Sequence, residues 1–499
     1  METRLSCGNL WKLPVQQVNK SERLYFLAIG GVAMGNVAIL ANRLGYGVSG
    51  CDQSLYPPMD RLLGASGIPF IEKFSMEHLV NFAPDRVVIG NAVPRGNAVV
   101  EYLLEHERQR MVSLPEFLSR DLVKTRKRIV ISGSHGKTTT TAIAAFYMRQ
   151  MGIRGGYFIG GIPKNLPNGA DIGDSAAPFV FEGDEYDCAF FDKRSKFIHY
   201  MPDTVVINRI DFDHGDIFRD IGAIQRSFSH LLRLVPNSGH VLVNGEDPNI
   251  AAILPVPWTT VHRVGWEKAN DFSIRNFSMN RDGSEWQVMH AEGLFCVKTS
   301  LHGRFNVMNA TMAILATHIT LGLPFPENID LRDYSGVGRR QEKLVENNGL
   351  VVIEDFGHHP RAIIEVLTSL RAQYPHDELI ACFEPATNTS MYRMWEEDYG
   401  KAFAACDRCF WGAPRNAAGV SSAKRLRIDR LMCALSQRIE EARCFSENRF
   451  LLDHLLEILQ QNAGGKRHVV VLFSSGAFPD VLTYWRAQSS RREENKASS

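Results

Sequence analysis

The sequence lacks long hydrophobic runs and an excess of charge of one sign. No apolar stretch approaches the about 18 residues of a transmembrane helix, and the first 24 residues lack the apolar segment of a signal peptide. The 56 Lys and Arg residues are balanced by 55 Asp and Glu residues, unlike the composition of a general nucleic-acid-binding protein. We expect a cytoplasmic monomer or homodimer with no membrane or nucleic-acid partner.

Cysteine is also sparse and shows no metal-binding or disulfide pattern. Nine cysteines are scattered over 499 residues, whereas disulfide scaffolds are short and cysteine-dense. Cys406 and Cys409 form a CxxC pair, but no second pair supplies the other two ligands of a structural zinc site. The sequence predicts neither kind of site.

Short apolar runs recur along the chain, and each is followed by Gly, Asp or Asn and then by a helix-like stretch. This alternation predicts an α/β fold, with parallel sheets covered by helices on both faces. The predicted strands lie at 24–30, 85–91, 128–133, 178–184, 204–211, 239–247, 350–356, 378–385 and 468–475.

At about 150 residues per domain, the length suggests three domains. Polar, charged seams lie at 120–128 and 331–342. The predicted division is an N-terminal extension (1–22), three domains (23–122, 123–335 and 336–488) and a disordered polar tail (489–499).

A phosphate-binding loop follows the apolar run 128–132. Gly133, Ser134, His135, Gly136, Lys137, Thr138 and Thr139 stand between this predicted strand and a helix-like stretch. Glycines let backbone N–H groups surround an anion, and the helix N-terminus adds its positive dipole end. Lys137 is placed to reach the terminal phosphates of ATP, and a threonine hydroxyl to bind Mg²⁺.

Two acidic clusters in the same region are candidates for the metal site. Glu182, Asp184 and Glu185 follow one apolar run, and Asp211, Asp213, His214 and Asp216 follow another. Carboxylate oxygens near nucleotide phosphates suit Mg²⁺, although a solvated acidic loop explains either cluster alone equally well.

A second glycine loop lies near the N-terminus. Gly30, Gly31 and Gly35 separate a predicted strand from a helix, and Asp52 ends the next predicted strand, as in Rossmann-like nucleotide sites. The GxGxxG pattern itself is not matched, so a nicotinamide dinucleotide and another nucleotide diphosphate both remain open. Two nucleotide loops in separate domains favour ATP-driven ligation or transfer over a redox reaction.

Taken together, these motifs resemble those of the Mur ligases, the ATP-dependent amide-forming enzymes of peptidoglycan synthesis. The resemblance covers about residues 22–480, and within the family it is strongest to the ligases that add a tripeptide during cell-wall recycling. The motifs are GGVAMG (30–35), GSHGKTTTT (133–141), DFDHGDIF (211–218), GRFNVMNA (303–310), GVGRRQE (336–342) and EDFGHHP (354–360), with YPPM (56–59), GNAVPRGN (90–97) and DEYDCAFFDKRSKFIHY (184–200) for the narrower match.

The resemblance implies a Rossmann-like domain that binds UDP-N-acetylmuramate, a central P-loop-type ATPase domain, and a Rossmann-like C-terminal domain that closes over both. The muramate carboxylate would attack ATP to give an acyl phosphate, which the amine of L-Ala-γ-D-Glu-meso-diaminopimelate would then attack. The alternatives are an L-alanine-adding ligase, a Rossmann oxidoreductase using NAD(P), and a nucleotide-binding regulator without activity.

The family's motifs assign roles to individual positions of this chain. Lys137, Glu182, His214 and Arg340 are the implied catalytic residues, and Thr138, Glu182 and His214 the implied Mg²⁺ positions. The remaining implied ATP contacts, beyond the phosphate loop and Arg340, are Asn306, Asn309 and Asp355. UDP-muramate is expected at Gly30, Gly31, Asp52, Asn91 and His135.

Four other features complete the sequence-based expectations. Lys193, Arg194 and Lys196 form a basic cluster, which we hypothesise to meet an anionic substrate. His358 and His359 are interpreted as structural residues. The chain departs from the family pattern at EDF (354–356), which replaces DDF, and at Ala386 and Thr387, which stand where the recycling ligases tend to have Arg and Ser.

Overall fold

The computed structural model describes residues 22–55, 59–212, 215, 217–387, 389–415, 420–461 and 465–497. By its internal contacts the chain divides into two compact units. One holds the residues up to Ile210, with Ile224–Ser273 and Ala310–Phe325, and the other holds Asp211–Ala223, Ile274–Asn309 and the residues from Pro326 onward. Within the described residues, no helix is both long and apolar enough to cross a bilayer.

The first sheet is parallel throughout and has the order β3-β2-β1-β4-β5. Helices and loops cover the central strands, and the side chains of these strands are apolar. Leu24, Phe26 and Val88 are fully buried. The strands are β1 (Arg23–Leu27), β2 (Gly47–Cys51), β3 (Phe70–Ile71), β4 (Arg86–Ile89) and β5 (Met111–Ser113), and the helices are α1 (Val32–Arg43), α2 (Met59–Ala65), α3 (Met76–Phe82), α4 (Ala98–His106) and α5 (Leu114–Phe117).

The second sheet has eleven strands in the order β18-β17-β16-β15-β14-β13-β12-β6-β9-β7-β8. Its parallel part includes β6 (Arg128–Ser132), β7 (Gly156–Phe158), β9 (Phe179–Gly183), β12 (Thr204–Ile207), β13 (His240–Asn244) and β14 (Thr260–Gly265). The other strands are β8 (Ala170–Asp171), β15 (Phe272–Asn280), β16 (Gly283–His290), β17 (Gly293–Thr299) and β18 (Asn328–Leu331), and the helices are α6 (Lys137–Gln150), α7 (Ile221–Leu232), α8 (Pro248–Ala251) and α9 (Arg304–Leu321). A separate hairpin joins β10 (Asp187–Ala189) to β11 (Asp192–Ser195).

The third sheet has the order β19-β20-β24-β21-β22-β23, and only the edge strand β19 is antiparallel. Helices α10, α11 and α12 pack on one of its faces, and α13 and α14 pack on the other. The strands are β19 (Glu342–Glu346), β20 (Leu350–Asp355), β21 (Glu378–Phe383), β22 (Arg408–Trp411), β23 (Glu441–Cys444) and β24 (His468–Phe473), and the helices are α10 (Pro360–Gln373), α11 (Glu396–Phe403), α12 (Ile428–Leu435), α13 (Asn448–Gln461) and α14 (Val481–Ala497).

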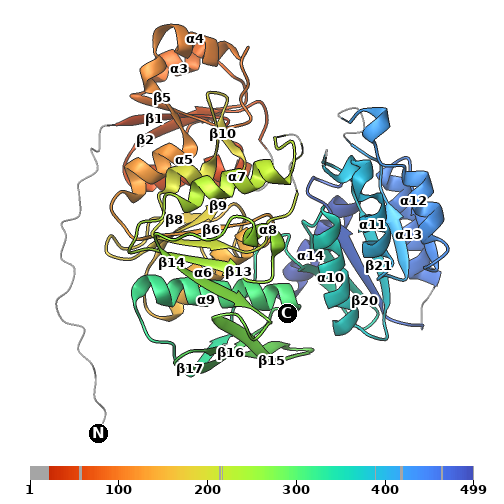
Figure 1. The fold of residues 1–499 in the computed structure, drawn as a ribbon. Helices are drawn as coiled ribbons and strands as arrows, with labels where there is room; N and C mark the ends of the chain where they lie inside the picture. Colours follow the sequence, from red (N-terminus) through yellow and green to blue (C-terminus); the bar gives the residue numbers. More distant parts are fainter. Residues whose placement is uncertain are drawn as a thin grey trace. The chain divides into compact units, whose positions relative to one another are not determined.

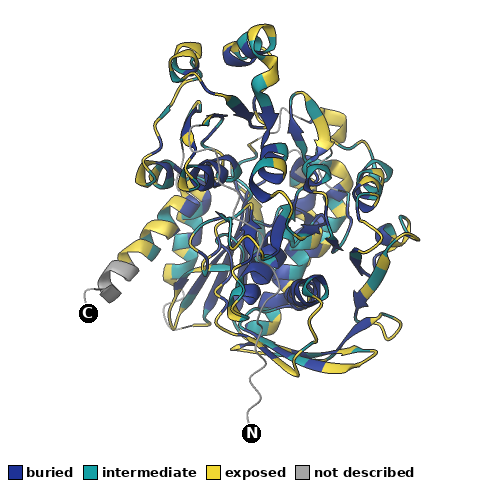
Figure 2. Ribbon diagram, turned by 90° about the vertical axis from the view of Figure 1, so that its left-hand side faces the viewer, coloured by how far each residue is buried: buried dark blue, intermediate teal, exposed yellow. Residues whose placement is uncertain are grey.

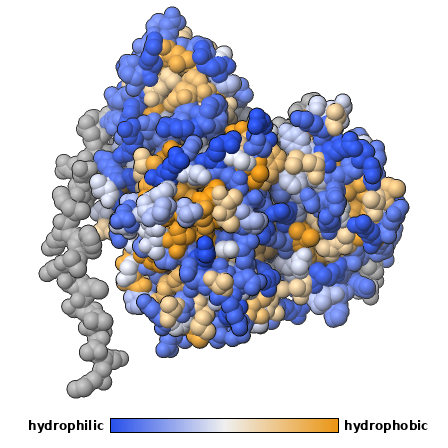
Figure 3. Space-filling model, viewed as in Figure 1, coloured by the Kyte–Doolittle hydropathy of each residue, from blue (hydrophilic) through white to orange (hydrophobic). Residues whose placement is uncertain are grey.

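All nine predicted strands are confirmed, together with the α/β class (Figure 1). Figure 2 shows the strands mostly in dark blue and the outer faces of the helices in yellow, as expected for sheets covered on both sides. The face drawn in Figure 3 is mainly hydrophilic, with smaller apolar areas between. The five-part division of the chain stays a prediction, with residues 1–21 outside the described part.

Helix α14 reaches into the polar tail, whose predicted disorder stays a prediction. Helix α14 continues to Ala497, so nine of the eleven tail residues are helical in the structure. The segment RREENKA (491–497) consists largely of strong helix formers, and it extends a helix that residues Val481, Leu482 and Trp485 already anchor in the core.

Candidate functional site

The predicted phosphate loop lies between β6 and α6, at the carboxyl end of a central strand. Gly133 has φ of 131°, and a Cβ there would lie 2.7 Å from the carbonyl oxygen of Asn208, so no other residue fits this backbone. Gly136 caps α6 with φ of 78°, and Ser134 N donates to Arg209 O at 2.9 Å. Half-buried His135 lies between them. The loop therefore has the predicted strand, glycine turn and helix in sequence.

Lys137 begins α6, and its ammonium group is held inside the loop. The Nζ atom donates to Gly133 O and to Glu185 Oε2, each at 2.8 Å, and Glu185 is only 2% exposed. Burial alone would lower the pKa of Lys137, but the carboxylates of Glu185 and Asp184 outweigh it and raise this pKa. The lysine therefore stays charged, and Glu185 is its partner here. Sequence reasoning considered Glu185 only as part of a metal cluster.

Two of the three predicted metal positions touch each other. Thr138 Oγ1 donates to Glu182 Oε1 at 2.7 Å, and Gly160 N donates to Glu182 Oε2 at 2.6 Å. Burial raises the pKa of Glu182 in spite of these hydrogen bonds. A hydroxyl and a carboxylate beside a phosphate loop are the hard oxygen donors that Mg²⁺ prefers. Thr139 follows on the same first turn of α6.

The second acidic cluster is only partly described. Its members Asp213, His214 and Asp216, including the predicted catalytic and metal position His214, lie outside the described residues. Asp211 is buried and pairs through Oδ1 with Arg361 Nη1. This ion pair engages one oxygen of Asp211, and the predicted metal role of the cluster stays a prediction.

The N-terminal glycine loop is closed by Asp52. Its Oδ2 accepts the N–H of Gly30 at 2.8 Å, and a Cβ on Gly30 would lie 2.7 Å from Leu55 Cδ2. Gly31 caps α1, whose N-terminus points at this loop, and Asn91 is exposed just beyond the carboxyl end of β4. The four predicted residues thus border the carboxyl ends of β1, β2 and β4, where ligands of open α/β sheets collect.

The cations of the basic cluster pair with nearby carboxylates, and the hypothesis that the cluster meets an anionic substrate stays a prediction. Its three cations each form an ion pair at 2.5–2.8 Å. The pairs are Lys193 with Asp187, Arg194 with Asp192, and Lys196 with Asp184. Each of the three cations is therefore matched by one nearby carboxylate.

One group of side chains in the described part of the chain has the proximity of metal ligands. Cys188, Asp192 and His199 have ligand atoms within 4.8 Å of one another. Arg194 already occupies this place, because two of its nitrogens contact Asp192 and Nη2 lies 3.4 Å from His199 Nε2. Burial also raises the pKa of the Cys188 thiol to about 12, which opposes thiolate ligation.

In the other unit, Asp355 organises the turn that carries Arg340. Its Oδ2 accepts the N–H of Gln341 at 3.0 Å, and its Oδ1 accepts the N–H of Gly357 at 2.7 Å. Burial raises the pKa of Asp355, although the Arg340 guanidinium acts in the opposite direction. Arg340 lies over the ring of Phe356, 4.6 Å from its centroid. Asp355 therefore fixes the backbone beside the predicted catalytic arginine.

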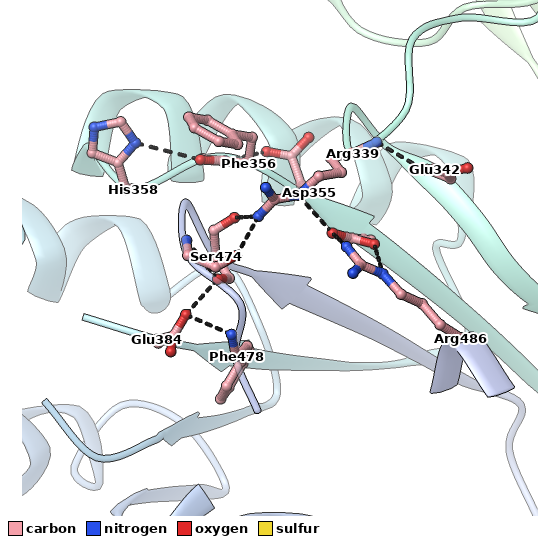
Figure 4. A network of polar contacts seen from close by, with 12 residues as sticks. Arg339, Glu342, Asp355, Phe356, His358, Glu384, Ser474, Phe478 and Arg486 are labelled. Carbon is pink, nitrogen blue, oxygen red and sulfur yellow. Dashed lines mark hydrogen bonds and ion pairs between the residues drawn. The ribbon is translucent and has the colours of Figure 1, made fainter. Parts of the chain in front are cut away.

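Arg339, which precedes the predicted catalytic arginine, is a structural cross-link (Figure 4). It donates to Glu354 Oε1 at 2.8 Å and to the backbone oxygens of Ser474 and Gly476 at 2.8 and 2.6 Å. Glu354 is 1% exposed and also accepts from Arg486 of α14 at 2.6 Å. The glutamate of the EDF motif thus joins two arginines from distant parts of the chain.

The replacement Glu354→Asp, which restores the family's DDF pattern, is expected to lower the free energy of unfolding by about 1–2 kcal/mol. The shorter side chain loses reach to one arginine, and charge-assisted hydrogen bonds contribute about 1.5–3 kcal/mol each, less where one partner is half-exposed. Denaturant unfolding measures the difference. The control is Glu397→Asp, because the Glu397 side chain is 81% exposed and pairs with Lys401 on the surface. This control should change the free energy of unfolding by less than about 0.5 kcal/mol. Equal losses of stability in the two variants would contradict the role of Glu354 as a cross-link.

The remaining predicted residues are Asn306 and Asn309 on α9 and His359 before α10. Asn306 Nδ2 donates to His302 O at 2.9 Å, and Asn309 Nδ2 lies 3.4 Å from Asn306 Oδ1; both asparagines are buried on α9. His359 accepts the N–H of Arg361 and caps α10, which confirms its structural interpretation. The nucleotide role of the two asparagines stays a prediction.

Comparison with known proteins extends this agreement along the chain. The Mur ligase family, catalytic domain, matches residues 23–121, and the Mur ligase middle domain matches residues 131–317. Two relatives, from Haemophilus influenzae and Escherichia coli K12, are 36% and 38% identical to this chain. Both are named UDP-N-acetylmuramate--L-alanyl-gamma-D-glutamyl-meso-2,6-diaminoheptandioate ligase. The first alignment spans 464 residues, 92% of this chain and 97% of the relative, and the second 395 residues, 78% and 84%.

A solved structure gives the same result in three dimensions. The crystal structure of a murein peptide ligase from Psychrobacter arcticus 273-4 superposes with a TM-score of 0.66 at 29% identity, covering 93% of this chain and 99% of that one. The similarity therefore runs through both matched domains and on into the C-terminal sheet. On this extent of identity and shared structure, the chain belongs to the Mur ligase family.

Proposed function

We propose that this chain is an ATP-dependent ligase that joins L-alanyl-γ-D-glutamyl-meso-diaminopimelate to UDP-N-acetylmuramate. The observation that carries the proposal is the phosphate loop with charged Lys137 and the touching pair Thr138 and Glu182, in a chain whose full-length relatives bear this ligase's name. The cytoplasm is the proposed location, since ATP and nucleotide-linked precursors are found there.

The chemistry requires activation of a carboxylate, because hydroxide is a poor leaving group. An oxygen of the muramate carboxylate attacks the γ-phosphorus of ATP, and ADP departs. The amine of the peptide then attacks the acyl carbon, the C–O bond to phosphate breaks, and the amine loses a proton. Phosphoryl transfer depends on positioning and on charge stabilisation. Lys137 and the backbone N–H groups of the loop supply positive charge at the phosphates.

Magnesium fits the oxygen donors found beside the loop. Thr138, Glu182 and His214 are the proposed residues that hold it, and the ion would neutralise phosphate charge when bound. We assign UDP-muramate to Gly30, Gly31, Asp52, Asn91 and His135, and further nucleotide contacts to Asn306, Asn309, Arg340 and Asp355.

The deciding measurement is phosphate release from ATP in the presence of UDP-N-acetylmuramate, with either the tripeptide or L-alanine as the acceptor. We expect release that depends on the tripeptide. Release with L-alanine alone would identify an L-alanine-adding ligase instead. No release with either acceptor, together with NAD(P)H binding, would favour the oxidoreductase alternative.

A further inference from the structure

No chemical step of the proposed reaction requires the β10–β11 hairpin, although the stretch 184–200 that contains it carries part of the narrower resemblance. The hairpin follows β9, the strand that pairs with the phosphate-loop strand β6. It belongs to the same compact unit as the first sheet and the parallel part of the second. Its root and its tip can therefore be related to both sheets.

The root of the hairpin is fixed beside the phosphate loop. Glu185, two residues before β10, accepts from Lys137 Nζ at 2.8 Å. After β11 the chain enters a short helical turn, Lys196–Tyr200, and the Tyr200 ring stacks on Phe181 of β9 with the ring centroids 4.3 Å apart. Tyr200 is 1% exposed and Phe181 is fully buried. One end of the hairpin is thus tied to the phosphate-loop lysine and the other to the core of the second sheet.

The tip of the hairpin reaches the first sheet. The turn between β10 and β11 consists of Phe190 and Phe191. Phe190 is partly buried and packs against the apolar cluster of the first sheet, whereas Phe191 is 42% exposed. That cluster includes the last residues of β1, β2 and β4, which are Leu27, Cys51 and Ile89. The tip is therefore docked on the sheet that carries the N-terminal glycine loop.

Side-chain contacts stiffen the hairpin between root and tip. Asp192, beside the turn, accepts from Arg194 Nη2 at 2.8 Å, and its Oδ2 lies 2.7 Å from His199 Nε2 in the root. The hydrogen bonds of Arg194 hold the pKa of Asp192 well below its usual range, so the aspartate stays charged. Cys188 Sγ donates to Arg194 O at 3.1 Å across the strand pair. These contacts connect the turn to the root and keep the length of the hairpin fixed.

The hairpin thus extends from the phosphate loop to the first sheet. The first sheet carries the proposed muramate site at Gly30 and Asp52, and the root holds Lys137, which is proposed to bind the ATP phosphates. Attack of a carboxylate on the γ-phosphorus needs the two substrates in contact and in line, and a misplacement of about 1 Å can cost about 10²-fold in rate. A rigid connection between the two sites supplies that alignment.

We propose that the β10–β11 hairpin (Asp187–Ser195) is a strut that holds the muramate-binding loop and the phosphate loop at a fixed separation, with Phe190 as the positioning residue at its tip. The inference rests on the proposed function, since it assigns the alignment of that same site. Phe190 acts through the sheet on which it packs, without touching either substrate. Loss of its ring should therefore impair phosphoryl transfer more than it impairs binding of either nucleotide.

The test compares the wild-type enzyme with Phe190→Ala, both as the full chain. We expect kcat for phosphate release, at saturating ATP, UDP-N-acetylmuramate and tripeptide, to fall about 10–100-fold. The Kd values of UDP-N-acetylmuramate alone and of ADP alone, measured by calorimetry, should change less than about threefold, because each site keeps its own contacts. Single-turnover trapping of the acyl phosphate with borohydride should show the same loss as kcat, which assigns the loss to phosphoryl transfer.

Two further variants separate alignment from general damage to the hairpin. Phe191→Ala removes the neighbouring ring, which is 42% exposed, and should leave kcat unchanged. Phe190→Leu keeps most of the apolar side chain and should lose less kcat than Phe190→Ala, again with both Kd values kept. Thermal unfolding checks that each variant is folded.

Three results would overturn the strut and leave the proposed function standing. The first is wild-type kcat in a folded Phe190→Ala enzyme, or in Phe190→Leu where the alanine variant does not fold. The second is a loss of kcat matched by an equal loss of affinity for UDP-N-acetylmuramate or ADP. The third is an equal loss of kcat in Phe191→Ala.

The wild-type enzyme separates this inference from the proposed function. A wild-type enzyme that releases no phosphate with either acceptor would overturn both together. A loss of kcat confined to the Phe190 variants of an active enzyme, with both Kd values kept, would support the strut.

Discussion

Replacing Lys137 with alanine is expected to reduce turnover about 10²–10³-fold or more, as does removal of a charge-stabilising group from other active sites. The lysine stays protonated because Glu185 and Asp184 raise its pKa, so its positive charge is present throughout the neutral range. Phosphoryl transfer concentrates negative charge at the loop, where Lys137 Nζ is bound to Gly133 O at 2.8 Å. Phosphate release under saturating substrates measures the loss.

The matched control is Lys298→Ala, which removes a lysine ion-paired with Glu285 on the β16–β17 hairpin. It should retain normal turnover. Thermal unfolding of both variants shows whether the fold is intact, since Lys137 and Glu185 form a nearly buried pair. Near-normal turnover in a folded Lys137→Ala enzyme would contradict the phosphate-loop assignment.

Replacing Glu182 with glutamine is expected to lower turnover about 10²-fold or more at fixed Mg²⁺, with partial recovery as Mg²⁺ is raised. The amide keeps the hydrogen bond with Thr138 but loses the negative charge that attracts the metal. Magnesium activation curves, measured through phosphate release, give the change in metal affinity. Thr138→Ser keeps a hydroxyl and should change this affinity little.

The pH dependence follows from the raised pKa of Glu182. A carboxyl group with a raised pKa takes up its proton at a higher pH than usual, and the protonated form binds Mg²⁺ poorly. Apparent Mg²⁺ affinity should therefore weaken as the pH falls through this pKa and recover above it, whereas the glutamine variant should lack this transition. An identical Mg²⁺ activation constant for both enzymes at every pH would contradict the metal assignment.

The nine predicted strands could be found because strands buried on both faces are continuous runs of apolar residues. The run 204–207 of β12 and the run 468–473 of β24 are buried at every position. The antiparallel strands β15, β16 and β17 were missed for the opposite reason. Their buried and exposed residues alternate, and their polar faces give no apolar run to find.

The candidate site could be predicted where local geometry defines it. The phosphate loop is a compact motif formed by Gly133, Gly136 and Lys137. Its two glycines have positive φ, and glycine at such positions can be recognised directly in the sequence. Ion pairs between distant segments leave no such trace. The partner of Lys137 lies 48 positions away, and Arg339 contacts the backbone of Ser474 135 positions away. Only the folded chain brings these groups together.

Glu185 holds Lys137 in one position inside the phosphate loop. The ammonium group has three N–H donors, and Gly133 O and Glu185 Oε2 take two of them, each at 2.8 Å. A phosphate can therefore meet the third donor without breaking the ion pair. The lysine is oriented in advance, so binding of a nucleotide need not order a flexible side chain.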